Sequence, residues 1–367
     1  KIDIQIQHIY KLLNKLKATQ RTTRLYKYVK PSLDELLQIK NQHEALGLEL
    51  KYISDSKSRL NDSLIEATLK KDFSEKLDIY EQQLIIAKQI TFSLWQYMEG
   101  NIEQADEVLD VLISSFNNKI KLPNLDANLL LNRVYNLKAK IAALKPGQIN
   151  KELSIKYYNY AIMILPNDVI TYSNFIGLLT DRARSENNPY LQLQAYNYYE
   201  KISLDQMPEE QTPMVCSSLA YSLIMLAKNI EQEKIADAKI KKLPSVISLH
   251  DKAQSLLKNS IHFNPNYLNA RLHLAILFYE QQSYNQALQE IDIALVINSE
   301  HPIAQTYKGL ILEKLNFKDE ALEYLNMAKR NFEAQKNSID NLGWIKEIDE
   351  AIEEAKLKSN KKLRLKH

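Results

Sequence analysis

A 34-residue spacing in the C-terminal third is the feature that most limits how this chain can fold. Ala253, Ala287 and Ala321 are 34 residues apart. A large apolar residue follows each alanine by four positions, and a small residue comes three positions later: Leu257, Ile291 and Leu325, then Ser260, Ala294 and Ala328. Residues at offsets of three and four share one face of an α-helix. The spacing therefore predicts repeated helices that each approach a neighbouring helix closely.

A partner helix repeats with the same period. Each partner carries a large residue, a small residue directly after it, and an aromatic or aliphatic residue three positions further on. The equivalent positions in two consecutive units are Leu274, Ala275 and Phe278, and Lys308, Gly309 and Leu312. A fixed period of this length is the signature of a stacked array of helix pairs.

With Tyr284 near the turn and the Ala287, Ile291 and Ala294 ladder after it, this pattern resembles the tetratricopeptide repeat family. The resemblance implies an all-α fold, a right-handed α-solenoid of helix-turn-helix units. Lys308 departs from the family pattern, which has an aliphatic residue there, so we expect its stem to be buried and its ammonium to lie at the edge.

Towards the N-terminus the units follow the 34-residue pattern less regularly, but helix pairs can still be assigned. We predict about six helix pairs between residues 80 and 333, with an insert at about 230–250 that forms a surface excursion. A capping helix over 334–357 then covers the last apolar face, which a solenoid requires. The predicted helices before the insert are 80–99 with 102–116, 127–144 with 149–165, 172–181 with 191–202, and 214–228.

The first 75 residues follow a different pattern. Ile2, Ile6, Ile9, Leu13 and Leu16 are spaced like the a and d positions of a heptad, and a second seam begins at residue 46. This predicts an N-terminal helical hairpin or coiled-coil segment over 1–75, ahead of repeats over 76–333. An extra repeat-like packing layer and self-association through 1–70 are the open alternatives.

Composition agrees with a folded, helical chain. The 367 residues include only 6 Gly and 10 Pro, which argues against an all-β protein because such a fold needs frequent turns. The single cysteine, Cys216, excludes an internal disulfide framework and cysteine-based zinc modules. No run reaches the roughly 18 uninterrupted apolar residues of a membrane span. We expect a cytoplasmic protein, or a membrane-associated one if an anchor precedes Lys1.

The sequence contains no recognisable catalytic site. The seven histidines show no metal-binding spacing such as HExxH, and no glycine-rich phosphate loop occurs. Cys216 lies near a predicted helix start, which could lower its pKa, but a structural role fits better. We therefore expect no enzymatic activity, no cofactor and no metal.

Both ends of the chain are basic, although the net charge is only +3. Residues 1–30 carry eight Lys or Arg and one acid, and a basic tail follows the capping helix over 358–367. Such ends could bind nucleic acid or an anionic membrane, or could be solvated or steer a partner. The basic residues considered are Lys11, Lys15, Lys17, Arg21, Arg24, Lys27, Lys361, Lys362 and Arg364.

The resemblance also implies a function. Proteins of this family bind extended peptides or partner helices on a concave groove formed mainly by the first helix of each pair. The groove positions carried over are Ser217, Tyr221, Ile224, Asn269, Leu272, Ile276, Tyr279, Ile303, Thr306 and Leu310. This mostly apolar set favours an apolar peptide or amphipathic helix as ligand. We expect a scaffold, adaptor or assembly factor; a peptide-responsive regulatory sensor is the alternative.

Overall fold

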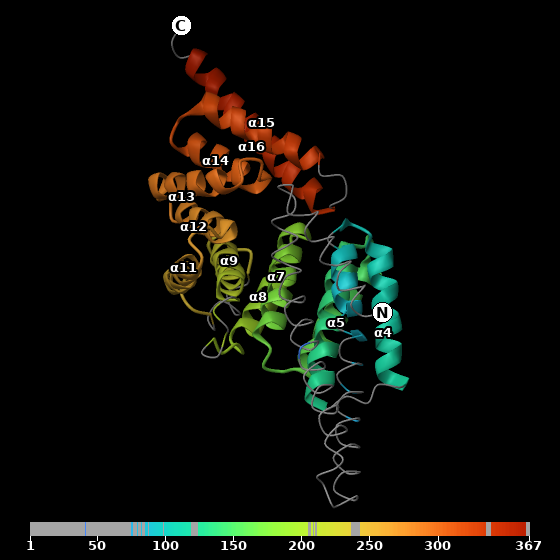
Figure 1. The fold of residues 1–367 in the computed structure, drawn as a ribbon. Helices are drawn as coiled ribbons and strands as arrows, with labels where there is room; N and C mark the ends of the chain where they lie inside the picture. Colours follow the sequence, from blue (N-terminus) through green and yellow to red (C-terminus); the bar gives the residue numbers. More distant parts are fainter. Residues whose placement is uncertain are drawn as a thin grey trace, which may run out of the picture. The chain divides into compact units, whose positions relative to one another are not determined.

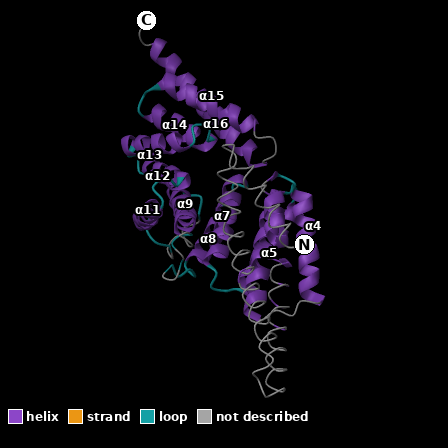
Figure 2. Ribbon diagram, in the orientation of Figure 1, coloured by secondary structure: helices purple, strands orange, loops and turns teal. Residues whose placement is uncertain are grey.

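The computed structural model describes residues 88–97, 99–118, 124–204, 211–235, 243–334 and 339–364, together with a few single positions. All regular structure in these ranges is helical (Figure 2). The chain divides into two compact units, residues 1–166 and 167–367, which we call unit 1 and unit 2. The predicted repeat range 76–333 therefore falls in both units. Apart from single positions, the predicted segment 1–75 lies outside the described residues.

Among its described residues, unit 1 contains helical residues 88–97 and three longer helices that pack in sequence order (Figure 1). These are α4 (Ile102–Asn118), α5 (Asn124–Leu144) and α6 (Gln148–Ile164). Ile86, Ile90, Leu109, Val134 and Ile141 belong to its core. The predicted helices 102–116, 127–144 and 149–165 match α4, α5 and α6 closely, and the described residues of the predicted helix 80–99 are helical up to residue 99.

In the part that the structure describes, unit 2 contains four helix pairs followed by a single helix. Each first helix packs on its own second helix and also on the next first helix, which is the arrangement of an α-solenoid. The pairs are α7 (Val169–Ser185) with α8 (Pro189–Tyr199), α9 (Thr212–Glu231) with α11 (Val246–Phe263), α12 (Leu268–Glu280) with α13 (Tyr284–Ile297), and α14 (Pro302–Lys314) with α15 (Lys318–Ala334); α16 (Ile339–Arg364) follows.

The predicted alanine ladder lies in the core of unit 2. All nine ladder residues, from Ala253 to Ala328, have no solvent-exposed area. Ser260 occupies a small-residue position, and its hydroxyl donates a hydrogen bond to the carbonyl oxygen of Pro213 at 2.7 Å. The ladder residues therefore pack between helices as their spacing predicted, because small side chains let neighbouring helices approach each other closely.

Helices α14 and α15 approach each other closely at Gly309. A Cβ added to Gly309 would lie 2.7 Å from Cγ of Leu325 and 3.1 Å from the carbonyl oxygen of Ala321. Beside it, Nζ of Lys308 lies 2.6 Å from a carboxylate oxygen of Asp292 and 4.5 Å from the centre of the Tyr324 ring. The expectation of an edge-lying ammonium is confirmed.

The first helices of unit 2 end in a shared way that the repeat spacing did not predict. After α12, Gln282 has a positive φ of 58°, and the next amide, of Ser283, donates to the carbonyl oxygen of Phe278. After α14, Asn316 has a φ of 68° and Phe317 donates to Leu312. This is the Schellman motif, which satisfies the last carbonyls of a helix. The same bond closes the turns at Asn101, Asn188 and Lys234.

Helix α9 is the central helix of unit 2, with contacts to α7, α8, α11 and α12. Among the described residues it is the one helix long and apolar enough to cross a membrane, and 67% of its most apolar window is buried inside the protein. These neighbours account for its apolar character. A buried polar contact anchors it to the first pair: Nε2 of Gln192 donates to the carbonyl oxygen of Ser222 at 2.8 Å.

Two predicted boundaries differ from the structure. Of the predicted insert at about 230–250, α9 includes residues 230–231 and α11 includes 246–250, while 236–242 lie outside the described residues. Ile235, Leu249 and His250 are buried, so these positions are not part of a surface excursion. The capping helix extends to Arg364, so most of the predicted tail 358–367 is helical.

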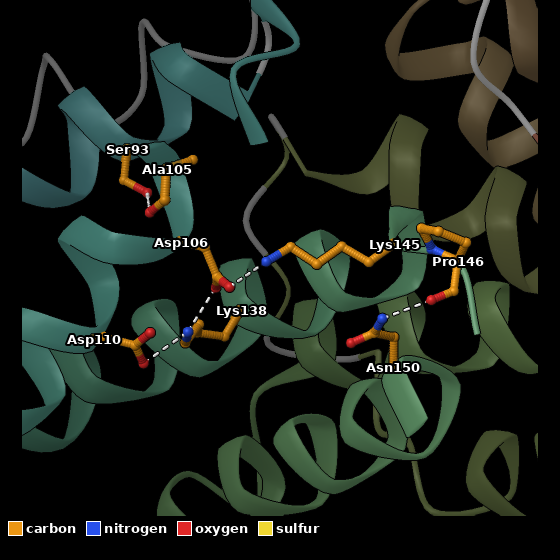
Figure 3. Close-up of polar contacts among 8 residues, drawn as sticks. All are labelled: Ser93, Ala105, Asp106, Asp110, Lys138, Lys145, Pro146 and Asn150. Carbon is orange, nitrogen blue, oxygen red and sulfur yellow. Dashed lines mark hydrogen bonds and ion pairs between the residues drawn. The ribbon is translucent and has the colours of Figure 1, made fainter. Parts of the chain in front are cut away.

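In unit 1, a charged network joins α4 to α5 (Figure 3). Nζ of Lys138 lies 2.6 Å from one carboxylate oxygen of Asp106 and 2.7 Å from Asp110, and Lys145 reaches the other oxygen of Asp106 at 2.6 Å. Burial opposes ionisation of Asp106, but the hydrogen bonds and charges of both lysines outweigh it and lower its pKa. The two lysines therefore stabilise the ionised form of the partly buried Asp106.

Candidate functional site

The candidate site is on the first helices of unit 2. Contacts run from α7 to α9, α12, α14 and α16, so these helices form one continuous layer (Figure 1). We call the side of this layer that faces away from the second helices the inner face. On α14, Gly309 faces α15, whereas Tyr307, two residues earlier, points to the opposite side. Tyr307 therefore marks the inner face.

Aromatic side chains from successive first helices meet on this face. Tyr221 of α9 stacks on His273 of α12, with ring centres 4.6 Å apart. Tyr279 of α12 meets Tyr307 edge to face at 5.8 Å, and Tyr307 meets Trp344 of α16 in the same way at 6.3 Å. Edge-to-face and offset-stacked rings attract each other beyond the area they bury.

An arginine connects the two ends of this layer. Cζ of Arg184, near the end of α7, lies 3.6 Å from the centre of the Trp344 ring, and its guanidinium donates to Glu347 of α16 at 3.1 Å. Because α7 and α16 are the outermost helices of the layer, this contact shows that the layer curves back on itself. We call Arg184, Tyr221, His273, Tyr279, Tyr307 and Trp344 the inner cluster.

Burial sets the charge state of these groups. It lowers the pKa of His273 to about 4, so its ring is neutral at pH 7. Nδ1 of His273 lies 3.0 Å from the carbonyl oxygen of Ser217 and 2.9 Å from its hydroxyl oxygen, so the ring is held against α9 by hydrogen bonding. Burial also raises the pKa of Tyr279 to about 12 and that of Tyr307 further. The rings are therefore neutral hydrogen-bonding groups.

One ion pair borders the cluster. Nζ of Lys228 on α9 donates to Glu280 of α12 at 2.8 Å. Burial favours the neutral form of Lys228, but the charge of Glu280 and this hydrogen bond outweigh it and raise the pKa of Lys228. The pair ties α9 to α12 on the same side as the stacked Tyr221 and His273, so two adjacent contacts fix the spacing of these helices.

The predicted groove residues divide into two groups. Tyr221, Asn269, Tyr279, Ile303 and Leu310 are half-buried, and two of them belong to the inner cluster. The other five are buried inside unit 2, which differs from an accessible groove: Ser217, Ile224, Leu272, Ile276 and Thr306. They are buried because first helices pack sideways on one another as well as on second helices. Partner contact by any of the ten stays a prediction.

The repeat pattern did not reveal the other members of the cluster. Arg184, His273, Tyr307 and Trp344 were absent from the predicted set. His273 and Tyr307 are 34 residues apart, directly before the equivalent pairs Leu274-Ala275 and Lys308-Gly309. That offset was a usable signal for inner-face aromatic residues. No local pattern indicates the contact between Arg184 and Trp344.

The remaining chemical candidates have structural roles or fall outside the described residues. Cys216 is buried, and burial raises its pKa, which is opposite to the activation that a helix start could provide. Among the residues the structure describes, no three His, Cys, Asp or Glu are grouped to hold a metal ion. Lys11, Lys15, Lys17, Arg21, Arg24 and Lys27 lie outside the described residues. Lys361, Lys362 and Arg364 lie on α16.

Comparison with known proteins gives fold-level similarity only. No family model matches the sequence, and no curated protein matches it. The similar solved structures include PilF of Pseudomonas aeruginosa, with 17% identity over 71% of this chain and 97% of that one and a TM-score of 0.41. Acl4, described as an assembly chaperone of RpL4, has 11% identity over 76% of this chain and 98% of that one, with a TM-score of 0.42. The TPR2AB domain of yeast Sti1, in complex with an HSP90 peptide, has 12% identity over 90% and 98%, with a TM-score of 0.27.

These scores are below 0.5, so the classification depends on the helices themselves. Four features of the described residues indicate a solenoid of repeated helix pairs. They are the 34-residue period, the buried ladder of small residues, the consecutive packing of the pairs and the shared Schellman ends. In the part that the structure describes, the chain is an all-α solenoid of helix pairs whose 34-residue spacing resembles that of tetratricopeptide repeats.

Proposed function

We propose that this protein is a non-catalytic interaction scaffold that binds a partner's apolar peptide or amphipathic helix on the inner face of unit 2. The observation that supports this most is the convergence of aromatic side chains from α9, α12, α14 and α16 on that face. Neutral, rigid aromatic rings supply contact area at low entropic cost, and aromatic residues are enriched in protein interfaces.

Residues on α14 extend this surface. Ile303, Tyr307 and Leu310 are spaced four and three residues apart, which places them on one helix face. Ile303 and Leu310 are only half-buried, unlike Tyr307 between them. They therefore offer apolar area that a partner could cover. Within the described ranges no comparable grouping suggests a reaction, so binding is the function the site supports best.

Replacing both Ile303 and Leu310 with aspartate is expected to weaken partner binding by at least tenfold, since each change puts a charge into an apolar contact. The measurement is quantitative affinity purification from the native cells, followed by titration of the recovered partner. Leu272 and Ile276 are unsuitable for this test because their burial would make an aspartate unfold the unit.

The matched control is Val296→Asp. Val296 is 88% exposed on α13, a second helix, so its replacement adds the same charge away from the inner face. The control should recover the same partner as the unchanged chain. Equal loss in the control, or full binding by the double variant with an unchanged circular dichroism spectrum, would contradict the assignment.

A further inference from the structure

The contact between α7 and α16 is more than a helix cap requires. The buried stripe of α16 consists of Trp344, Ile348, Ile352 and Ala355, and α16 packs on α15 and, less extensively, on α14. Covering that last pair needs only apolar side chains. Arg184 nevertheless reaches the Trp344 ring from a helix about 160 positions earlier in the sequence. Trp344 of α16 thus lies between Arg184 and Tyr307 on one side and Phe332 of the second helix α15 on the other.

The side chains that surround Trp344 come from three different helices. Its ring stacks on Phe332 of α15 at 5.9 Å, meets the edge of Tyr307 and lies under the guanidinium of Arg184. Glu347, three residues later and on the same side of α16, accepts from that guanidinium. An arginine between a ring face and a carboxylate is a specific arrangement, since its planar cation can stack and donate at once.

We propose that the inner face of unit 2 recognises a helix with an aromatic residue followed three positions later by a carboxylate. In this structure α16 fills the site within the same chain, and a partner helix with the same pair replaces it. The exchange with a partner depends on the proposed scaffold function, whereas the closure by α16 does not.

The contact of Arg184 with Trp344 and Glu347, which we call the closure, can open while the rest of α16 stays in place. Trp344 is buried, but Glu347 is exposed and the Arg184 guanidinium lies at the rim, so water reaches the ion pair. Such exposed pairs contribute little by themselves, and the stacked ring supplies most of the contact. Ile348, Ile352 and Ala355 keep the rest of α16 in place. Only the first turns of α16 need to leave for the site to open.

The closure is tested by fluorescence of the full chain. The sequence has two tryptophans, so Trp95→Phe leaves Trp344 as the reporter. In that background, Arg184→Ala is expected to shift the emission to longer wavelength and to increase quenching by acrylamide. Arg271→Ala is the control, because Arg271 is similarly shielded and pairs with Glu290 at 2.8 Å, away from α16. Unchanged emission in Arg184→Ala, or an equal shift in the control, would overturn the closure.

Recognition is tested with a synthetic peptide of residues 339–352 carrying a fluorescent label. Because Trp344→Ala weakens the competing contact in the chain, the variant is expected to bind the peptide roughly tenfold more tightly than the unchanged protein does. Adding Arg184→Ala, or replacing the peptide's tryptophan with alanine, should abolish that gain. Equal binding by the unchanged and Trp344→Ala chains, or a gain that survives Arg184→Ala, would overturn the recognition site.

The two tests separate the possible failures. Emission that responds to Arg184→Ala without any peptide binding keeps the closure and overturns recognition of an added helix. If neither response occurs in folded protein, both parts fail. Loss of a native partner after Ile303 and Leu310 are replaced is a third and independent readout, so the scaffold function can fail or stand apart from the closure.

Discussion

Replacing Gly309 with alanine is expected to lower the free energy of unfolding by about 2 kcal/mol. The added methyl group would meet Cγ of Leu325 at 2.7 Å and a backbone oxygen at 3.1 Å. Neither atom is the free end of a flexible side chain, so α14 and α15 must move apart. Alanine normally stabilises a helix relative to glycine by roughly 0.5–1 kcal/mol, which offsets only part of this cost. Chemical denaturation followed by circular dichroism measures the change.

Gly177→Ala is the matched control, since Gly177 also lies in the interior of a first helix. A methyl group there would meet only the hydroxyl of Ser218, at 3.3 Å, and that hydroxyl can rotate. The expected result is no loss of stability, or a gain of up to about 1 kcal/mol. If both variants behave alike, the close approach at Gly309 does not limit the spacing of α14 and α15.

Replacing Asp106 with asparagine is expected to cost about 2 kcal/mol at neutral pH, because it leaves the buried ammonium of Lys138 without its main partner. The side chain of Lys138 is only 3% exposed, and Asp106 is 22% exposed. The control is Asp110→Asn, which removes the other carboxylate that contacts Lys138. Asp110 is 64% exposed, so its loss should cost under about 1 kcal/mol.

The cost of Asp106→Asn should depend on pH in a fixed direction. The pKa of Asp106 is lower in the folded chain than in the unfolded chain. Its stabilisation is therefore fully present above the unfolded pKa of about 4 and is lost as the pH falls through the folded value. Denaturation at a series of pH values should show the difference between the variant and the unchanged protein shrinking in acid. A constant difference would contradict the ionic role of Asp106.

Local sequence carried most of the information about the helices. The ladder at Ala287, Ile291 and Ala294 predicted buried positions, and the helix over 102–116 agrees with α4, because helical periodicity depends on neighbours within a few residues. Boundaries were less predictable. Residues 358–364 look like a solvated basic tail by composition, yet their backbone continues α16.

Only two of the six residues of the inner cluster were predicted, for a different reason. Tyr221 and Tyr279 followed from family positions, but the contact of Arg184 with Trp344 depends on how strongly four successive pairs curve. That curvature accumulates from small rotations between neighbouring pairs, and no short pattern encodes the sum. The same packing explains why Leu272 and Ile276, which the pattern placed on an open surface, are buried between first helices.

The Schellman ends of the first helices have a consequence for how such a chain can change. Each first helix of unit 2 ends through bonds within its own last turn and the residue after it, such as Gln282 or Asn316. The way in which the helix ends therefore does not depend on the length of the connection that follows it. The link from α9 to α11 is longer than the one from α12 to α13, yet both first helices end with the same bond and pack on their second helices. New segments could enter at these turns during evolution or engineering without altering the register of the stack.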